Sequence, residues 1–230
     1  MARTDRYTRN MNTLSQEENR SLKSFKVCVI GCGGLGGYVI EMLGRIGIGS
    51  ITAVDYDKFD ETNLNRQILA NTTTLGRNKA IVSCERMKKV NPEITLNPVE
   101  ERFDNYNGNR IILGNDIVVD ALDNSDTKRL LGRLCSEQKI PLVHGAIGGW
   151  YGQVTTIFPG DETMELLYKD SNNPGIEKQL GNPSFTPALV AAAQVAEVMK
   201  VLLKREGVLR NRILYVDLLN MEFDVVELKK

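Results

Sequence analysis

The feature that most constrains this chain is a glycine-rich turn between an apolar run and an amphipathic run. Residues 26–31 read KVCVIG, and residues 34–47 carry apolar side chains at spacings of three and four. The first pattern predicts a buried strand and the second predicts a helix. The turn between them holds Gly31, Gly33 and Gly36 in a G-x-G-x-x-G pattern. Strand, glycine turn and helix in this order are typical of the first unit of a nucleotide-binding parallel sheet.

The same alternation of strand and helix patterns continues along the chain. Further helices are predicted within residues 76–94, where the helix stops at Asn91-Pro92, and over 124–139, and further strands at 50–57, 95–103, 116–122 and 140–146. A last helix is predicted with Thr186 as its N-cap and Pro187 in its first position, and Gly207 follows its end. Strands at 150–158 and on both sides of residues 219–220 predict an antiparallel extension. The predicted fold class is α/β and Rossmann-like, with a mostly parallel sheet, helices on both faces and an antiparallel C-terminal extension.

Length and charge predict one soluble domain. Residues 1–230 suit a single α/β domain, with an N-terminal arm at 1–25 and a mobile loop at 159–183. The 29 basic and 29 acidic residues balance, which argues against general binding to nucleic acid or to a membrane surface. Residues 1–20 contain acids and no apolar core, so neither a secretory signal nor a transit peptide is predicted. We expect a cytoplasmic protein that binds neither nucleic acid nor membranes.

The cysteines and the histidine predict no metal centre. Cys28, Cys32, Cys84 and Cys135 include no CxxC pair, so their spacing indicates neither a zinc site nor a disulfide framework. Cys32 lies within the glycine turn, where a small packing residue is expected. The one histidine, His144, is expected to be a core or loop residue.

The glycine turn predicts a nucleotide ligand. The backbone can approach a ligand closely at Gly31, Gly33, Gly34 and Gly36, and the N-terminus of the following helix favours phosphate. Asp55 ends the next predicted strand, where a carboxylate accepts hydrogen bonds from ribose hydroxyls. The alternative is that these glycines only form a tight turn. The position of Asp55 at the end of the next predicted strand favours nucleotide binding over this alternative.

The polar run after Asp55 favours a triphosphate over a dinucleotide. The run contains Asp57, Asn63, Arg66 and Gln67, and Lys79 follows near the start of the next predicted helix. Amide and cationic side chains suit phosphate oxygens, whereas a nicotinamide ring usually needs a dry, apolar pocket. For Arg66 and Lys79 the alternative is a solvated helix face.

A third polar cluster closes the predicted strand at residues 116–122. Asp120 and Asp123 lie where ligands bind in open parallel sheets. Asp123 could hold Mg²⁺ on a polyphosphate, because magnesium prefers a few carboxylates together with phosphate oxygens and water. We assign Asn124 to the same nucleotide site. The alternative is that Asp123 or Asn124 only caps the helix that follows.

These motifs, in this order, resemble the MoeB/ThiF/HesA family, the bacterial relatives of the ubiquitin-activating enzymes. The matching segments are RYTRN at 6–10, GCGGLGG at 31–37, DYDKFDETNLNRQ at 55–67, GRNKA at 76–80, NPEI at 91–94 and ALDNSDTKR at 121–129. The resemblance implies an adenylyltransferase that uses ATP and Mg²⁺ to activate the C-terminal glycine carboxylate of a small ubiquitin-fold protein, releasing pyrophosphate. It implies a ThiS- or MoaD-like partner ending in Gly-Gly, in thiamine or molybdopterin biosynthesis.

The resemblance also implies roles for single residues. Asp55 would hold the ribose and Asp123 would bind Mg²⁺. Phosphate contacts would come from Asn63, Arg66 and Lys79, with Gln67 as a supporting contact. Arg9 resembles an arginine that the family supplies across a homodimer, so a homodimer is expected. The implied catalytic residues are Arg9, Arg66, Lys79 and Asp123.

The chain departs from the family pattern in three places. It lacks the two CxxC pairs by which many relatives bind structural zinc. It has no cysteine after Cys135, so no covalent carrier cysteine is expected in the loop at 161–182. Lys128 stands where the family pattern has an arginine, with Arg129 beside it.

Two other functions remain open from the sequence. Adenylation could act on a different acceptor, such as a peptide C-terminus or a tRNA base. The chain could instead be a non-catalytic nucleotide-binding module or an NAD-dependent oxidoreductase.

Overall fold

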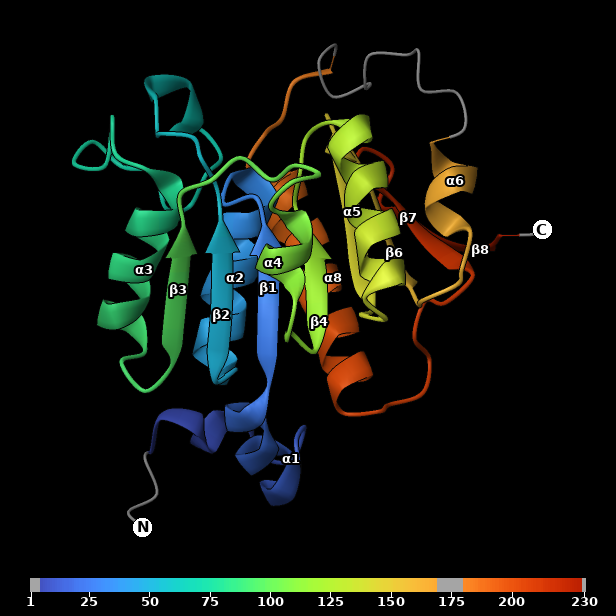
Figure 1. Ribbon diagram of the computed structural model, residues 1–230, viewed down its shortest axis with the longest axis horizontal. Helices are drawn as coiled ribbons and strands as arrows, with labels where there is room; N and C mark the ends of the chain where they lie inside the picture. Colours follow the sequence, from blue (N-terminus) through green and yellow to red (C-terminus); the bar gives the residue numbers. More distant parts are fainter. Residues whose placement is uncertain (1–4, 169–179, 229–230) are drawn as a thin grey trace.

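The computed structural model describes residues 5–168 and 180–228, in which eight strands form one sheet (Figure 1). The strands lie in the order β3-β2-β1-β4-β5-β6-β7-β8. Neighbours from β3 to β5 are parallel, and neighbours from β5 to β8 are antiparallel. The bounds are β1 Lys26–Ile30, β2 Ser50–Val54, β3 Thr95–Val99, β4 Ile117–Asp120, β5 Leu142–Gly148, β6 Tyr151–Ile157, β7 Arg212–Asp217 and β8 Glu222–Glu227. The predicted α/β fold with an antiparallel C-terminal extension is confirmed.

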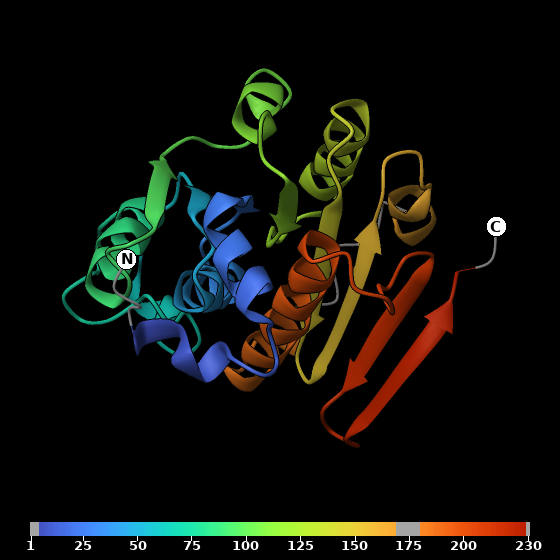
Figure 2. The ribbon, with the colours of Figure 1, turned by 90° about the horizontal axis from the view of Figure 1, so that it is seen from below.

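Helices cover both faces of the sheet, as Figure 2 shows. Helices α2, α3 and α8 pack on one face, and α4, α5 and α6 pack on the other. The α-helices are α1 Gln16–Ser21, α2 Gly34–Ile46, α3 Lys79–Val90, α4 Gly108–Ile112, α5 Ser125–Glu137, α6 Thr163–Leu167 and α8 Phe185–Leu202. The part of the chain that the structure describes also has three short 3₁₀ helices, η1 Asp5–Asn10, η2 Leu22–Ser24 and η3 Glu61–Asn63.

The unbroken apolar run of β1 follows from burial on both sides of the sheet. Val27 and Val29 belong to the core under α2 and α8. Cys28 and Ile30 point the other way and belong to the core under α4 and α5. Successive side chains of a strand face opposite sides, so a strand covered on both faces needs apolar residues at every position. Burying each large side chain stabilises the fold by about 1.5–3 kcal/mol.

Three element ends differ from the sequence prediction, each because of a side-chain hydrogen bond that the sequence pattern did not indicate. Strand β2 ends at Val54, because the Asp55 carboxylate accepts from the backbone of Asp57 and turns the chain. Helix α3 begins at Lys79, because the side chain of Asn78 caps it by accepting from two backbone N–H groups. Helix α8 begins at Phe185 rather than after Thr186, whose hydroxyl donates to the carbonyl of Gly149 instead of capping.

Part of the segment predicted as a mobile loop at 159–183 is helical. Helix α6 places Met164 in the core beside α5, where it fills the space left by the absent side chain of Gly132. Residues 169–179 of that segment lie outside the described residues. Met164 is the only residue of α6 in this core cluster, so the segment has no repeating apolar pattern from which a helix could be predicted.

The N-terminal arm packs at the amino ends of the strands, far from the carboxyl ends (Figure 1). Leu14 and Leu22 belong to the core under α2. Tyr7 is buried, and its hydroxyl accepts a hydrogen bond of 2.7 Å from Asn91. Asn10 donates to the carbonyl of Ile46 at the end of α2. Helix η1, which carries Arg9, is therefore docked on this end of the molecule.

Helix α8 is the one described helix long and apolar enough to span a membrane, but 56% of it is buried against the protein. It packs on α2 and on strands β5 and β6, as a core helix does.

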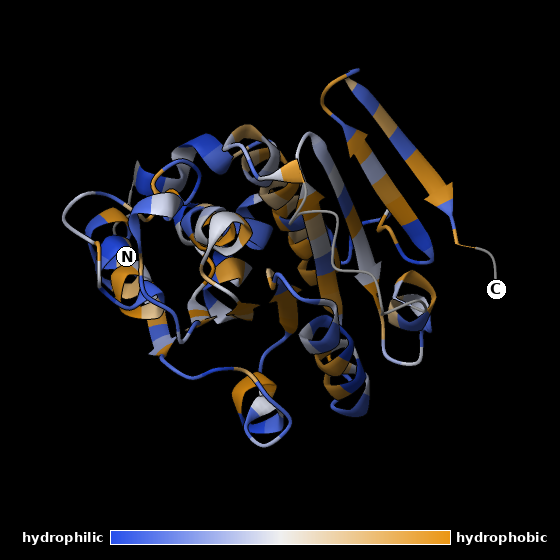
Figure 3. Ribbon diagram, turned by 90° about the horizontal axis from the view of Figure 1, so that it is seen from above, coloured by the Kyte–Doolittle hydropathy of each residue, from blue (hydrophilic) through white to orange (hydrophobic). Residues whose placement is uncertain are grey.

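Apolar and polar residues alternate along the hairpin β7–β8 at the edge of the sheet (Figure 3). All six residues of β8 are exposed.

Candidate functional site

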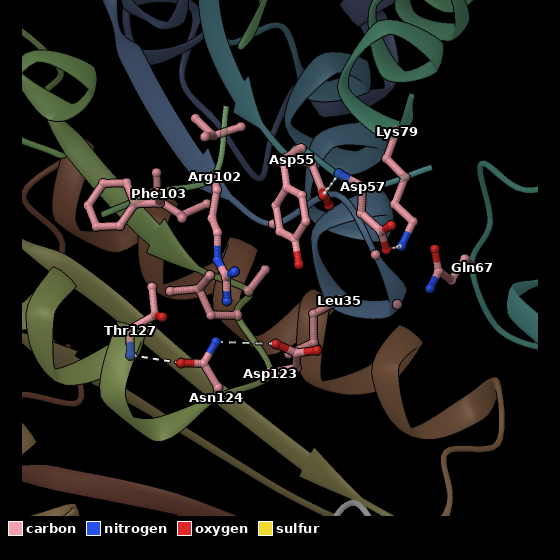
Figure 4. Close-up of a pocket in the computed structure, with 18 of the residues that line it drawn as sticks. Leu35, Asp55, Asp57, Gln67, Lys79, Arg102, Phe103, Asp123, Asn124 and Thr127 are labelled. Atoms are coloured by element: carbon pink, nitrogen blue, oxygen red, sulfur yellow. Dashed lines mark hydrogen bonds and ion pairs between the residues drawn. The ribbon is translucent and has the colours of Figure 1, made fainter. Parts of the chain in front are cut away.

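A cleft of about 390 Å³ opens at the carboxyl ends of β1, β2 and β4. Strand β1 has β2 and β3 on one side and β4 and β5 on the other. The order in which the chain adds strands to the sheet therefore reverses direction beside β1. This is the position where open α/β sheets bind ligands. Ten of the predicted site residues line it, namely Gly31, Gly33, Gly34, Asp55, Asp57, Arg66, Gln67, Lys79, Asp123 and Asn124. Figure 4 shows several of them around the cleft.

The glycines of the turn have different structural roles. Gly31 has a positive φ of 99°, and a Cβ there would lie 2.5 Å from the carbonyl oxygen of Ala121. Gly33 and Gly34 line the cleft at the N-terminus of α2. Gly36 is not among the lining residues, and a Cβ there would overlap with the carbonyl of Gly31. Its absent side chain lets α2 pack closely on the end of β1, which is a structural role.

Asp55 is held by backbone groups at the end of β2. Its carboxylate accepts hydrogen bonds from the backbone N–H of Cys32 at 2.8 Å and of Asp57 at 2.9 Å. Burial raises the pKa of Asp55, although both hydrogen bonds act to lower it. A carboxylate accepts about four hydrogen bonds, so Asp55 retains capacity for ligand hydroxyls.

Lys79 brings a cation to the cleft from the first turn of α3. Its ammonium group forms an ion pair of 2.7 Å with Asp57. Only 7% of the Lys79 side chain is exposed, against 54% for Asp57. An ammonium group has three donors, so a ligand oxygen in the cleft could share Lys79 with Asp57.

The segment after η3 supplies one lining cation and one structural amide. Arg66 lines the cleft, and its guanidinium donates to the carbonyl of Thr62 and to the side chain of Asn65, both at 2.9 Å. Asn63 is buried and does not line the cleft. Its side chain bonds with Asp60 in a reciprocal cap of η3, so it shapes the segment that presents Arg66.

Two amide side chains of the cleft wall have buried oxygens that find no hydrogen-bond partner within the described part of the chain. These are Oε1 of Gln67 and Oδ1 of Asn182. Gln67 is 6% exposed. An unpaired buried acceptor is costly, so such atoms in a cleft often have a ligand partner.

Asp123 and Asn124 form the opposite wall, between β4 and α5. Both are exposed and line the cleft. Asn124 also caps α5 by accepting from the backbone of Thr127 at 2.8 Å, which leaves Asp123 without the capping role. No group of three potential ligands among histidine, cysteine, aspartate and glutamate occurs in residues 5–168 and 180–228. Metal binding here would therefore use Asp123 together with ligand oxygens.

The structure adds lining residues that the sequence did not single out. Glu101, Arg102 and Phe103 follow β3 and reach the cleft, where the guanidinium of Arg102 lies 5.4 Å from the ring centre of Tyr56. Their position directly after a strand end was the available signal. Asn182, from the segment before α8, gave no such signal because it depends on the tertiary path of that segment.

Beneath the cleft lies a buried charged network centred on Asp120 at the end of β4. Lys128 contacts both carboxylate oxygens of Asp120 at 3.1 and 3.2 Å and donates to the carbonyl of Gly145 at 2.9 Å. His144 Nδ1 lies 2.7 Å from Asp120 Oδ2. Asp120 also accepts from the backbone N–H of Leu122, which shapes the turn that leads to Asp123. Lys128, in place of the family's arginine, is thus a core residue.

The charge states in this network follow from its geometry. Burial raises the pKa of Asp120, but Lys128 and His144 outweigh it and hold that pKa below its ordinary value. Burial lowers the pKa of His144. The neutral ring donates from Nδ1 to the ionised Asp120, leaving Nε2 to accept from Gln153 at 3.4 Å and Tyr168 at 3.3 Å. His144, expected to be a core or loop residue, is fully buried in the core.

Arg9 does not line the cleft of its own chain. It lies on η1 at the amino ends of the strands, whereas the cleft is at their carboxyl ends. Its role across a dimer stays a prediction.

The chain is similar to known adenylating enzymes along almost its whole length. The model of the ThiF family matches residues 7–230. The SAMP-activating enzyme E1 of Haloferax volcanii is 36% identical over 227 residues, covering 96% of this chain and 84% of that enzyme. The sulfur carrier protein adenylyltransferase of Thermus thermophilus is 32% identical over 230 residues, covering 95% and 85%. The crystal structure of E. coli MccB with ATP shares the fold, with a TM-score of 0.81 at 21% identity over 100% of this chain and 72% of that one.

Proposed function

Because this chain belongs to the ThiF family, we propose that it is an ATP-dependent adenylyltransferase for the C-terminal carboxylate of a small ubiquitin-like sulfur-carrier protein. The names of its relatives support this choice, since one activates SAMP and another is an adenylyltransferase of a sulfur carrier protein. Both align over most of their length. A dinucleotide-dependent oxidoreductase has no comparable support.

The observation that carries the proposal is the order in which aromatic, acidic and basic side chains follow one another along the cleft. Phe103 and Arg102 lie at one end of the labelled group in Figure 4 and Gln67 at the other, with Asp55 between them. Aromatic Phe103 suits a purine base, and the carboxylate of Asp55 suits ribose hydroxyls. The triphosphate would then lie along the N-terminus of α2 toward Arg66 and Lys79. In that orientation the α-phosphate would lie where a carboxylate could approach it.

Magnesium would be held by Asp123. It is an exposed carboxylate on the cleft wall, and Mg²⁺ combines one or two carboxylates with phosphate oxygens and water. When bound, the ion would neutralise part of the charge on the triphosphate.

The reaction joins two negatively charged groups. An oxygen of the carboxylate attacks the α-phosphorus, and the bond between that phosphorus and the bridging oxygen breaks, so pyrophosphate leaves with the bonding electrons. Arg66 and Lys79 reduce the repulsion between the reactants, and the cleft walls hold them in line. The step needs no protein nucleophile. Cys32, next to the site, is buried, and burial raises the pKa of its thiol well above the ordinary value.

The remaining assignments complete the proposal. Residues 1–230 act as one adenylation unit, and a homodimer supplies Arg9 to the partner's cleft. The protein works in the cytoplasm and binds neither nucleic acid nor membranes. Adenylation of a peptide C-terminus or a tRNA base is the second candidate function.

ATP–pyrophosphate exchange tests the proposal. The purified protein, ATP and labelled pyrophosphate are incubated with ubiquitin-fold carriers ending in Gly-Gly, and with the same carriers lacking that tail. We expect exchange only with the intact tail. ATP binding without exchange for any carrier would favour another acceptor.

A further inference from the structure

The unpaired oxygens of Gln67 and Asn182 lie at the same end of the cleft. Asn65, two residues before Gln67, donates from its side chain to the backbone carbonyl of Asn182 at 3.2 Å. A Cβ on Gly34 would lie 3.9 Å from Arg66 and 3.7 Å from Pro187. The segments that carry the two amides therefore converge on the N-terminus of α2, next to Arg66.

A triphosphate cannot supply what these two oxygens lack. Whichever way each amide is turned, its NH2 group can donate to a phosphate, but its oxygen is an acceptor and still needs an N–H or O–H donor. Phosphate oxygens, when ionised, only accept. The donors of ATP are the ribose hydroxyls and the amino group of adenine. In the proposed orientation the hydroxyls meet Asp55, and the amino group lies at the end near Phe103, away from Gln67 (Figure 4).

The second substrate does supply such donors. An extended polypeptide tail presents one N–H and one carbonyl per peptide group, and the primary amides of Gln67 and Asn182 can accept and donate. Glycine residues in the tail would let its backbone approach the wall without side-chain clashes.

We propose that the side-chain amides of Gln67 and Asn182 bind peptide groups of the acyl donor's C-terminal tail and so hold its terminal carboxylate near the α-phosphate. This inference rests on the proposed function, and it moves Gln67 from the nucleotide to the polypeptide substrate. The two amides read the backbone of the tail, so they select an extended, unbranched tail rather than a particular side chain.

Substitution separates the two substrates. In Gln67→Met the amide is lost at similar volume, and in Asn182→Leu likewise. We expect the KM for the carrier protein to rise about tenfold in each, as for the loss of one hydrogen bond of about 1.4 kcal/mol. The ATP dissociation constant, measured without carrier, should change less than twofold. Gln138→Met, at a partly exposed glutamine at the end of α5, is the matched control and should change neither value.

Folding is checked by thermal unfolding of each variant. Gln67 Oε1 accepts no hydrogen bond from residues 5–168 and 180–228, so Gln67→Met removes no contact within them and should unfold at the wild-type temperature or above it. A loss of ATP affinity as large as the loss of carrier affinity in a folded Gln67→Met would overturn the assignment to the tail.

A modified carrier tests the contact itself. Semisynthetic carriers carry an ester in place of one of the last peptide bonds, which removes a single N–H. If Gln67 accepts from that N–H, the ester should weaken binding to wild type about tenfold and to Gln67→Met hardly at all. Equal weakening in both proteins at every ester position would contradict the contact. Wild-type exchange with the unmodified carrier shows in the same assay that the proposed function holds.

Discussion

At the scale of single residues, burial decides the chemistry of the ionisable groups near the cleft. His144 and Lys128 carry ionisable side chains, and both are buried around Asp120. A buried ion pair costs desolvation energy and is often no more stabilising than an apolar replacement. Its contribution here is geometric, since Asp120 also holds the backbone of the turn that carries Asp123.

The stability of the protein should fall on mild acidification because of His144. Its pKa is lowered in the folded state, so below about pH 6.5 the unfolded chain binds a proton that the folded protein does not. The free energy of unfolding should then decrease by up to about 1.4 kcal/mol per pH unit, until the pH passes the folded pKa. Denaturant unfolding between pH 5.5 and 6.5 measures this slope.

His144→Asn is the matched variant, because its amide can donate to Asp120 without titrating. The chain has one histidine, so the free energy of unfolding of the variant should no longer show the decrease that His144 causes between pH 6.5 and 5.5. The raised pKa of Asp55 acts in the opposite direction at lower pH and is common to both proteins. The same slope in both would exclude His144 as the cause.

At the scale of elements, the glycine turn fixes how closely α2 approaches the sheet. The backbones of Gly31 and Gly36 are in direct contact, so the axis of α2 lies nearer to β1 than it could if Gly36 carried a side chain. That approach aims the N-terminus of α2 into the cleft, with Gly33 and Gly34 on its wall. The phosphate site and the packing of α2 therefore depend on the same turn.

Gly36→Ala should destabilise the fold by about 2–4 kcal/mol, because the methyl group would overlap with the carbonyl of Gly31. Gly37→Ala is the control in the same helix. Its methyl group would make ordinary contacts of 3.4 Å with Ile68 and Leu69, and alanine favours a helix over glycine by about 1 kcal/mol. Thermal unfolding compares the two. Equal stability would contradict the close packing of α2.

At the scale of the whole molecule, the cleft and the N-terminal arm lie at opposite ends of the strands (Figure 1). Arg9 therefore cannot complete the cleft of its own chain unless the arm undocks from contacts such as that between Tyr7 and Asn91. We therefore predict that a second copy of the chain supplies Arg9.

Mixing two inactive variants tests a shared site. Arg9→Ala and Asp123→Ala should each lose exchange activity, because each removes one proposed catalytic side chain from every site. Both residues are exposed, so neither substitution should disturb the fold. After subunit exchange, half of the dimers are mixed and carry one intact site, so about a quarter of wild-type activity should return. No recovery, with mixed dimers shown by mass spectrometry, would place Arg9 and Asp123 in one chain or Arg9 outside the site.

The sequence by itself determined the parallel sheet and the origin of the cleft. Apolar periodicity and the glycine turn are local signals, and in a parallel sheet the residues after β1, β2 and β4 must meet at one edge. The tertiary structure decided which polar groups are free to bind a ligand. It pairs Lys79 with Asp57, turns Asn63 into a cap and buries Lys128 on Asp120. Among the residues that the structure describes, it leaves the side-chain oxygens of Gln67 and Asn182 without a partner. Pairing and burial depend on contacts between segments distant in the chain, and no local pattern encodes those contacts.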